Sequence, residues 1–136
     1  MSARTKARKR ALDILYAAEL RSQSPVAALD DAIAVGEGPT NPYTDVLVRG
    51  VSEHRPRIDE LLAEYSQGWS LKRMPAVDRN VLRLGVYELL YVDDVPDAVA
   101  VDEAVGLVRS LSTDDSPGFV NGILGAMMRA KAEILA

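Results

Sequence analysis

Apolar residues recur at three- and four-residue steps along nearly the whole chain, and this spacing limits the fold more than any other feature. Over residues 5–21, for example, Leu12, Leu15, Tyr16 and Leu20 follow it. Such spacing puts side chains on one face of an α-helix. No segment shows apolar alternation of period two between hairpin turn signals, which is typical of β-strands. The sequence therefore predicts an all-α fold.

Three pairs of a capping residue and a proline mark helix starts, at residues 24–25, 41–42 and 116–117. Ser and Asn side chains accept hydrogen bonds from first-turn amides, and proline suits the first helical position because its missing N–H is not needed there. Pro56 should kink or break the long helix that begins after Asn41, near Arg55. A capped turn over 70–74 and helices over 77–92 and 101–111 complete a compact bundle of six or seven helices, a single domain spanning 1–136.

The composition excludes much familiar chemistry. The 136 residues include no cysteine and only one histidine, His54. Disulfides, thiolate zinc sites and cysteine nucleophiles are therefore impossible, and a histidine-pair metal site is too. Glu88, Asp102 and Glu103 offer carboxylates, but nothing singles out a nucleophile. Without a signal-peptide pattern or an apolar run near the roughly 20 residues that span a bilayer, we expect a cytoplasmic protein that is no enzyme and needs no cofactor.

Charge is distributed unevenly along the chain. The formal net charge of −4 combines +5 on residues 1–10 with −9 on the remainder. Contacts with phosphate depend on local charge, so the acidic total does not exclude a nucleic-acid partner. The five basic residues are Arg4, Lys6, Arg8, Lys9 and Arg10.

Projected on a helix, these five side chains surround the first turns on nearly every side. A segment that is cationic all round should not pack on a core, so we expect a projecting basic prong that holds an RNA strand, helped by the helix N-terminus. The alternative is a solvated, frayed terminus. A membrane-surface role would need an apolar face, which residues 1–10 lack.

A second basic set lies farther along the chain. Arg79 and Arg83 are four residues apart and share a helix face, and Lys72 and Arg73 precede them. They either extend an RNA track or pair with nearby acids. On the same helix, Asp78, Arg79, Asn80 and Arg83 form one polar side, and most of the rest is apolar.

Aromatic side chains are few. Tyr16 lies on the helix that carries the basic segment and is either a stacking platform for RNA or a core residue. Trp69 is expected to anchor a loop to the bundle, and Phe119 is either core or an exposed anchor.

The last helix has unusual small and polar residues. Gly118, Gly122 and Gly125 share a face, and their low helix propensity suggests that another helix approaches closely there. Asn121 and Glu88 lie in mostly apolar stretches and are expected to satisfy backbone groups inside the bundle.

Three stretches carry a family resemblance. VDRNVLRLGVYELLY (77–91), DVPDAVAVDEAVGLV (94–108) and DDSPGFVNGIL (114–124), in this order and spacing, resemble the NusB family of bacterial transcription antitermination factors. RTKARKRALDILYAAEL (4–20) resembles that family's arginine-rich start, whereas residues 22–70 match only in helical character.

The resemblance implies two small bundles that share the central helix. It also implies pairing with the ribosomal protein NusE and binding of single-stranded boxA RNA, so that an RNA polymerase elongation complex reads through terminators, notably in ribosomal RNA operons. Asp115 and Phe119 would face the protein partner. The expected RNA-binding residues are Arg4, Lys6, Arg8, Lys9, Arg10, Tyr16, Asp78 and Arg79, with Asp78 reading a base edge.

Two alternatives stand beside this interpretation, and the sequence disfavours the first. The same fold occurs as the RNA-binding module of ribosomal RNA cytosine methyltransferases, but the chain has no cysteine for methyl transfer and no length for a cofactor domain after Ala136. The other alternative is a non-catalytic protein-interaction scaffold or homodimer, in which the basic segment docks on an acidic protein surface.

Overall fold

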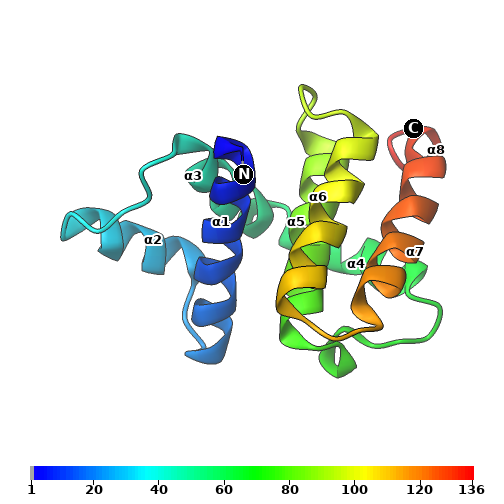
Figure 1. Ribbon diagram of the computed structural model, residues 1–136, viewed down its shortest axis with the longest axis horizontal. Helices are drawn as coiled ribbons and strands as arrows, with labels where there is room; N and C mark the ends of the chain where they lie inside the picture. The colour runs from blue at the N-terminus through cyan, green and yellow to red at the C-terminus, as the bar shows by residue number, and fades with distance from the viewer. Residues whose placement is uncertain (1) are drawn as a thin grey trace. The chain divides into compact units, whose positions relative to one another are not determined.

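The computed structural model describes residues 2–136, and every regular element in that range is helical (Figure 1). This confirms the predicted all-α fold, although residues 2–136 form eight α-helices where the sequence predicts six or seven. The chain divides into two compact units, one up to His54 and one from Arg55 onward. Two units agree with the two small bundles that the resemblance implies. That residues 1–136 form a single domain stays a prediction, and each unit is described by itself below.

The first unit consists of α1 (Ala3–Leu20), α2 (Pro25–Ala34) and α3 (Pro42–Glu53). Ser24 accepts a hydrogen bond from the amide of Ala27 at 3.3 Å, and Asn41 accepts one from the amide of Tyr43 at 2.9 Å. These contacts confirm the first two predicted cap-and-proline starts. Helix α1 packs against both α2 and α3. The buried apolar side chains of this unit include Ala7, Ala11, Leu12, Leu15, Leu29, Leu47, Val48 and Val51.

The predicted break near Arg55 is confirmed. Helix α3 ends at Glu53, His54 follows as its C-cap, and α4 (Arg55–Tyr65) begins directly after it. Pro56 is thus the second residue of α4, where the missing N–H leaves no hydrogen bond unmade.

The second unit begins with α4 and continues through η1 (Leu71–Arg73), a single 3₁₀ turn, to α5 (Ala76–Tyr91). It is completed by α6 (Asp97–Leu111), α7 (Ser116–Arg129) and the short α8 (Lys131–Ile134). Helix α5 packs against α4, α6 and α7, and it is the most extensively buried helix of the chain as described.

The close helix approach occurs at Gly85 on α5 and not on the glycine face of α7. A Cβ at Gly85 would lie 2.6 Å from Leu124 Cδ1, so a larger residue there would require the Leu124 side chain to shift. At Gly118 and Gly122, by contrast, a Cβ would meet nothing within 4 Å. The prediction of close packing on that face of α7 is therefore wrong.

Two polar residues of α7 also differ from expectation. Ser116 does not cap the helix, because α7 begins at Ser116 itself and the hydroxyl bonds Asp78 instead. Asn121 is exposed, so its predicted place inside the bundle is wrong, whereas Glu88 is buried as predicted. No helix among residues 2–136 is long and apolar enough to cross a membrane.

Candidate functional site

The first turns of α1 pack against α3 through two of their arginines. The guanidinium carbon of Arg4 lies 4.2 Å from the centroid of the Tyr43 ring, and that of Arg8 lies 5.8 Å from it. Arg8 is only 4% exposed and Tyr43 only 8%. Cations over an aromatic face are attracted by the ring quadrupole. The expectation of a freely projecting prong is therefore wrong, because one side of this cationic segment belongs to the packing of the first unit.

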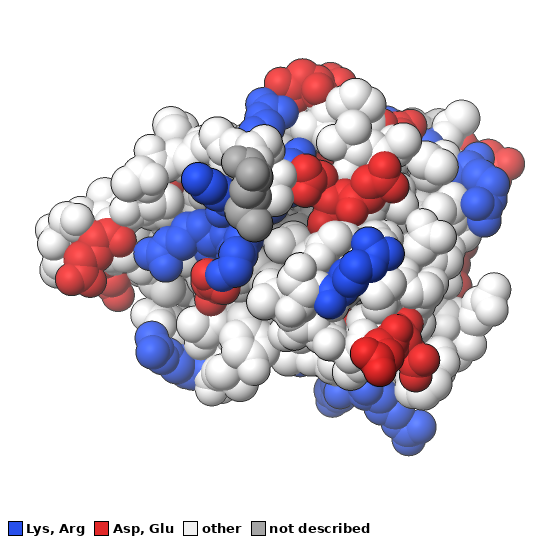
Figure 2. All heavy atoms as spheres, in the orientation of Figure 1, with Lys and Arg blue, Asp and Glu red and all other residues white. Residues whose placement is uncertain are grey.

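Lys6 and Arg10 lie one helical turn apart and are both exposed. They line a hollow that encloses about 330 Å³ and is closed on its other side by residues 38–41. Its walls are tied together, since Asn41 donates to the carbonyl of Ala3 at 3.3 Å and Thr44 donates to that of Ala7 at 3.0 Å. Figure 2 shows basic side chains gathered over α1. Arg10 also donates to the carbonyl of Glu37, at the long distance of 3.5 Å. The hollow therefore offers two exposed cations, of which Arg10 has one weak bond to the protein.

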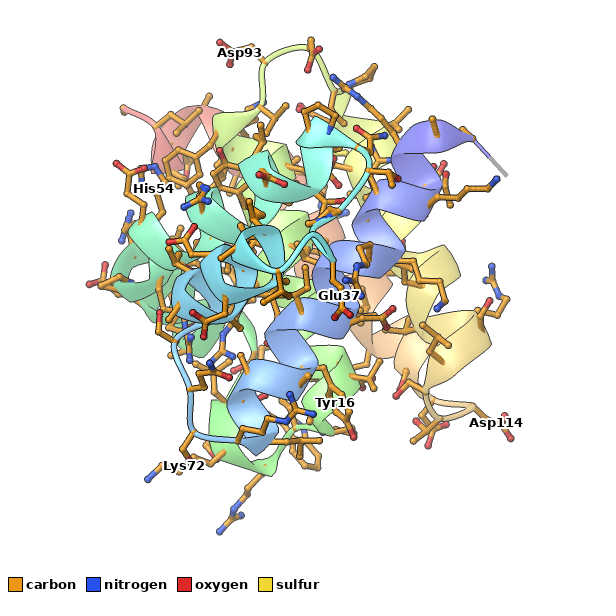
Figure 3. All side chains as sticks on the ribbon, turned by 90° about the vertical axis from the view of Figure 1, so that its left-hand side faces the viewer. Tyr16, Glu37, His54, Lys72, Asp93 and Asp114 are labelled. Carbon is orange, nitrogen blue, oxygen red and sulfur yellow. The ribbon has the colours of Figure 1, made fainter. Side chains whose placement is uncertain are left out.

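Lys9 and Tyr16 occupy other parts of α1. Lys9 Nζ lies 3.6 Å from Asp13 Oδ2, with both side chains about half exposed. Tyr16 is half-buried, and Figure 3 places it well along the helix from the basic start. Ten residues separate it from Lys6, or about 15 Å of helix. RNA that contacts both would have to run along α1.

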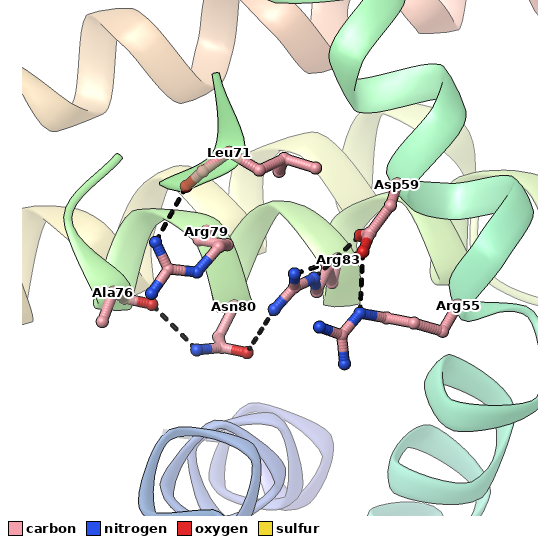
Figure 4. Close-up of polar contacts among 7 residues, drawn as sticks. All are labelled: Arg55, Asp59, Leu71, Ala76, Arg79, Asn80 and Arg83. Atoms are coloured by element: carbon pink, nitrogen blue, oxygen red, sulfur yellow. Dashed lines mark hydrogen bonds and ion pairs between the residues drawn. The ribbon is translucent and has the colours of Figure 1, made fainter. Parts of the chain in front are cut away.

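The polar side of α5 is largely buried, and its cations bond to protein oxygens (Figure 4). Arg83 donates through Nε and Nη2 to the two oxygens of Asp59, at 2.9 and 3.2 Å, and through Nη1 to Asn80 at 3.3 Å. Arg55 donates to the same carboxylate at 2.8 Å. The sequence leaves open whether this second basic set extends an RNA track or pairs with nearby acids. Arg83 pairs with an acid.

Arg79 also bonds inside the second unit. Its Nη1 donates to the carbonyls of Leu71 and Met74, at 2.8 and 2.9 Å. Lys72 and Arg73, in the turn between these carbonyls, are exposed.

Asp78 is buried, at 2% exposed. Ser112 donates to its Oδ1 at 2.6 Å, and Ser116 donates to its Oδ2 at 2.8 Å. Both carboxylate oxygens thus hold the turn between α6 and α7. The structure brings Asp78 together with the segment that contains Asp115 and Phe119, which sequence spacing alone does not reveal.

A mostly apolar hollow lies beside that turn. Its opposite sides come from residues 69–75 and residues 113–119, and it encloses about 220 Å³. The rings of Trp69 and Phe119 meet edge to face, with centroids 6.5 Å apart. Trp69 is 57% exposed, so it contacts the bundle at Phe119 but is not buried in it as a full anchor would be. The hydroxyl of Ser66 instead holds the loop, by donating to the Trp69 carbonyl at 2.6 Å.

The hollow combines exposed aromatic area with two exposed charges of opposite sign, Asp115 on one side and Arg73 on the other. Such an arrangement suits an apolar side chain of a protein partner with a cation on the side of Asp115, away from Arg73. The sequence indicated Asp115 and Phe119 but not the opposite side at Trp69 and Met74, because that pairing depends on the tertiary fold. Among residues 2–136, no group of three His, Cys, Asp or Glu side chains is placed to hold a metal ion.

The model of the NusB family matches residues 5–129. The chain belongs to the NusB family. The transcription antitermination protein NusB of Nocardioides sp. (strain ATCC BAA-499 / JS614) is 71% identical over 134 residues, which cover 98% of this chain and 99% of that relative. That of Arthrobacter sp. (strain FB24) is 55% identical over the full length of both chains.

Solved structures of NusB proteins share the fold. Thermotoga maritima NusB superposes with a TM-score of 0.83 at 33% identity, covering 98% of this chain and 97% of the other. A crystal structure of the antitermination factors NusB and NusE in complex with double-stranded RNA superposes with a TM-score of 0.80 at 28% identity, covering 93% and 96%. NusB proteins are non-enzymatic transcription antitermination factors, which confirms the prediction that this NusB chain is not an enzyme.

Proposed function

We propose that this NusB-family chain is an RNA-binding transcription antitermination factor that pairs with the ribosomal protein NusE. Its RNA would be the boxA element of nascent transcripts, and its target the RNA polymerase elongation complex of ribosomal RNA operons, in the cytoplasm. The similarity to a NusB solved with NusE and RNA supports the pairing. The observation that carries the proposal is the exposed cationic surface of α1 at Lys6, Lys9 and Arg10.

The RNA-binding half rests on local charge. Residues 1–10 carry +5, and three of these five side chains are exposed. Phosphate contacts supply affinity through counterion release, and base contacts supply specificity. Arg4 and Arg8, stacked on Tyr43, are held near the same surface and remain in the proposed set. Tyr16 would contact RNA that follows α1, while Asp78 and Arg79 have contacts inside the second unit that suit a different role.

The protein-binding half rests on the hollow of the second unit. Asp115 and Phe119 lie on its rim, opposite Trp69 and Met74. NusE would insert an apolar side chain between the two sides and place a basic residue near Asp115.

The test measures affinity for single-stranded boxA RNA against salt concentration. If the four basic residues other than the buried Arg8 each neutralise one phosphate, the log-log slope should be about −3. A scrambled strand of equal length should give the same slope and weaker binding, and a duplex of the same sequence tests strand preference. An affinity independent of salt would contradict the electrostatic half of the proposal. If purified NusE neither binds this chain nor raises its affinity for boxA RNA, the pairing half of the proposal is wrong.

The homodimer alternative gives a different result in the same solutions. An acidic body and a basic segment would attract each other between copies, so RNA would compete with dimerisation. Mass by light scattering with and without boxA RNA separates the two: the proposed function predicts one chain per RNA complex before NusE is added.

A further inference from the structure

Neighbouring residues of α5 are bonded to opposite sides of the aromatic hollow. One side consists of residues 69–75 and includes Trp69, and the other consists of residues 113–119 and includes Phe119. Asp78 lines the hollow between them, and Arg79 follows it in the chain.

Asp78 holds the side that carries Phe119. It receives one hydrogen bond from Ser112 at 2.6 Å and one from Ser116 at 2.8 Å. The Ser116 oxygen in turn accepts from the amide of Thr113 at 3.2 Å. Hydrogen bonds to a carboxylate are roughly twice as strong as neutral ones. Since Asp78 is 2% exposed and Ser116 is 1% exposed, water does not compete for these bonds. The first turn of α7 is therefore fixed to α5.

Arg79 holds the side that carries Trp69. Its guanidinium donates to the carbonyl of Leu71 at 2.8 Å, as Figure 4 shows. It also donates to the carbonyl of Met74 at 2.9 Å, so it bonds both ends of η1. A three-residue 3₁₀ turn has little stability of its own. Ser70 makes no capping bond to it, so a side chain from α5 supplies its support.

We propose that Asp78 and Arg79 are positioning residues of the partner-binding hollow. Together they set the separation of the Trp69 and Phe119 rings, and they control affinity for the protein partner without touching the partner. This inference rests on the proposed function, which places NusE at Asp115 and Phe119. It replaces the expectation that Asp78 reads an RNA base.

The central test is a double-mutant cycle between Asp78 and the two serines. The variants are Asp78→Asn, the pair Ser112→Ala with Ser116→Ala, and all three changes together, each titrated with purified NusE by calorimetry at a temperature where circular dichroism shows all to be folded. We expect Asp78→Asn to weaken NusE binding about tenfold, the cost of losing roughly one charge-assisted bond. The triple variant should bind no more weakly than either parent, because both act on the same turn. Losses that multiply would overturn the proposal, since they would mean that Asp78 contacts the partner directly.

The fluorescence of Trp69, the single tryptophan, reports on the hollow itself. Asp78→Asn and Arg79→Lys should each shift its emission, because each releases one side of the hollow. Arg79→Lys keeps the charge but loses the planar fork that serves two carbonyls. If Asp78→Asn fails to fold, NusE affinity and Trp69 emission of Arg79→Lys still test the proposal. An unchanged emission spectrum combined with full NusE affinity in Arg79→Lys would overturn the proposal.

Two controls separate positioning from other causes. Arg83→Gln destabilises the same helix without contacting the hollow, so it should lower the melting temperature and leave NusE affinity and Trp69 emission unchanged. Phe119→Ala tests the proposed function: if NusE binding survives it, the partner lies elsewhere and the proposed function fails. If Phe119→Ala weakens binding and Asp78→Asn does not, only the positioning proposal fails.

Discussion

The first turns of α1 and the polar side of α5 carry similar charges at similar spacing, yet the protein uses them differently. On α1, Lys6 and Arg10 are exposed at the edge of a hollow, and Arg10 has only a long bond of 3.5 Å, to the Glu37 carbonyl. On α5, Arg83 is buried against a carboxylate and Arg79 bonds two carbonyls. The comparison shows that an arginine four residues from another cation is no sign of a nucleic-acid surface by itself. The oxygens that the fold brings within reach decide its role.

Burial explains the difference in physical terms. The side chain of Arg83 is 5% exposed, and a buried guanidinium is tolerated only when its donors are paired. Asp59 and Asn80 provide that pairing. Lys6 keeps its ammonium group in water, where it can exchange hydration and counterions for a phosphate. Stability should therefore respond to changes on α5, and RNA affinity to changes on α1.

The largest effect is expected at Arg83. Arg83→Gln leaves the Asp59 carboxylate with a weaker set of donors, and because Asp59 is 26% exposed the loss should be about 2 kcal/mol of unfolding free energy, less than for a fully buried pair. Urea unfolding followed by circular dichroism measures it, and affinity for single-stranded RNA should stay unchanged. Arg55→Gln is the matched control, since Arg55 bonds the same carboxylate from a 41% exposed position and should cost less than about 1 kcal/mol. If Arg83→Gln leaves the unfolding midpoint unchanged and weakens RNA binding, then Arg83 contributes to RNA binding and not to stability, contrary to the comparison.

Local signals explain what the sequence predicted well. Ser24 and Asn41 cap helices that begin within three residues of them, so their roles depend on neighbours in the chain. The break at His54 follows from Pro56 in the same way. At Ser116 the local signal failed, because Asp78, 38 residues away, takes the hydroxyl.

The candidate sites show the same limit. The basic residues of α1 could be named from the sequence, but their division into a packed side and an exposed side depends on Tyr43, which reaches them only in the folded unit. Likewise, Phe119 was predicted as a possible anchor, whereas its contact with Trp69 was not. Tertiary contacts between distant segments leave no periodic trace in one sequence.

A smaller effect, on affinity, is expected at the exposed edge of α1. Replacing Lys6 and Arg10 together by alanine removes two accessible cations, so the log-log salt slope for single-stranded RNA should become shallower by about 1.4. The unfolding free energy should change by less than about 0.5 kcal/mol, as for most surface substitutions. Arg109→Ala with Arg129→Ala removes the same charge from exposed positions elsewhere and should leave the slope unchanged. Equal losses in both double variants would mean that net charge, and not the hollow at Lys6, attracts RNA.

The smallest effect is expected at Lys9, which combines features of both regions. It is exposed like Lys6, but Asp13 lies 3.6 Å from its ammonium group. Such a half-exposed pair contributes less than about 0.5 kcal/mol to stability. It also neutralises Lys9 locally, so Lys9→Ala should flatten the salt slope less than Lys6→Ala does. Asp13→Asn should have the opposite effect on RNA binding. It removes the acid beside Lys9, so affinity should rise and the salt slope should become steeper. Filter binding of the three single variants over a salt series measures all of this. If Lys9→Ala and Lys6→Ala flatten the salt slope equally, then the nearby Asp13 does not weaken the contact of Lys9 with RNA. Exposure alone would then distinguish the cations of α1 from those of α5.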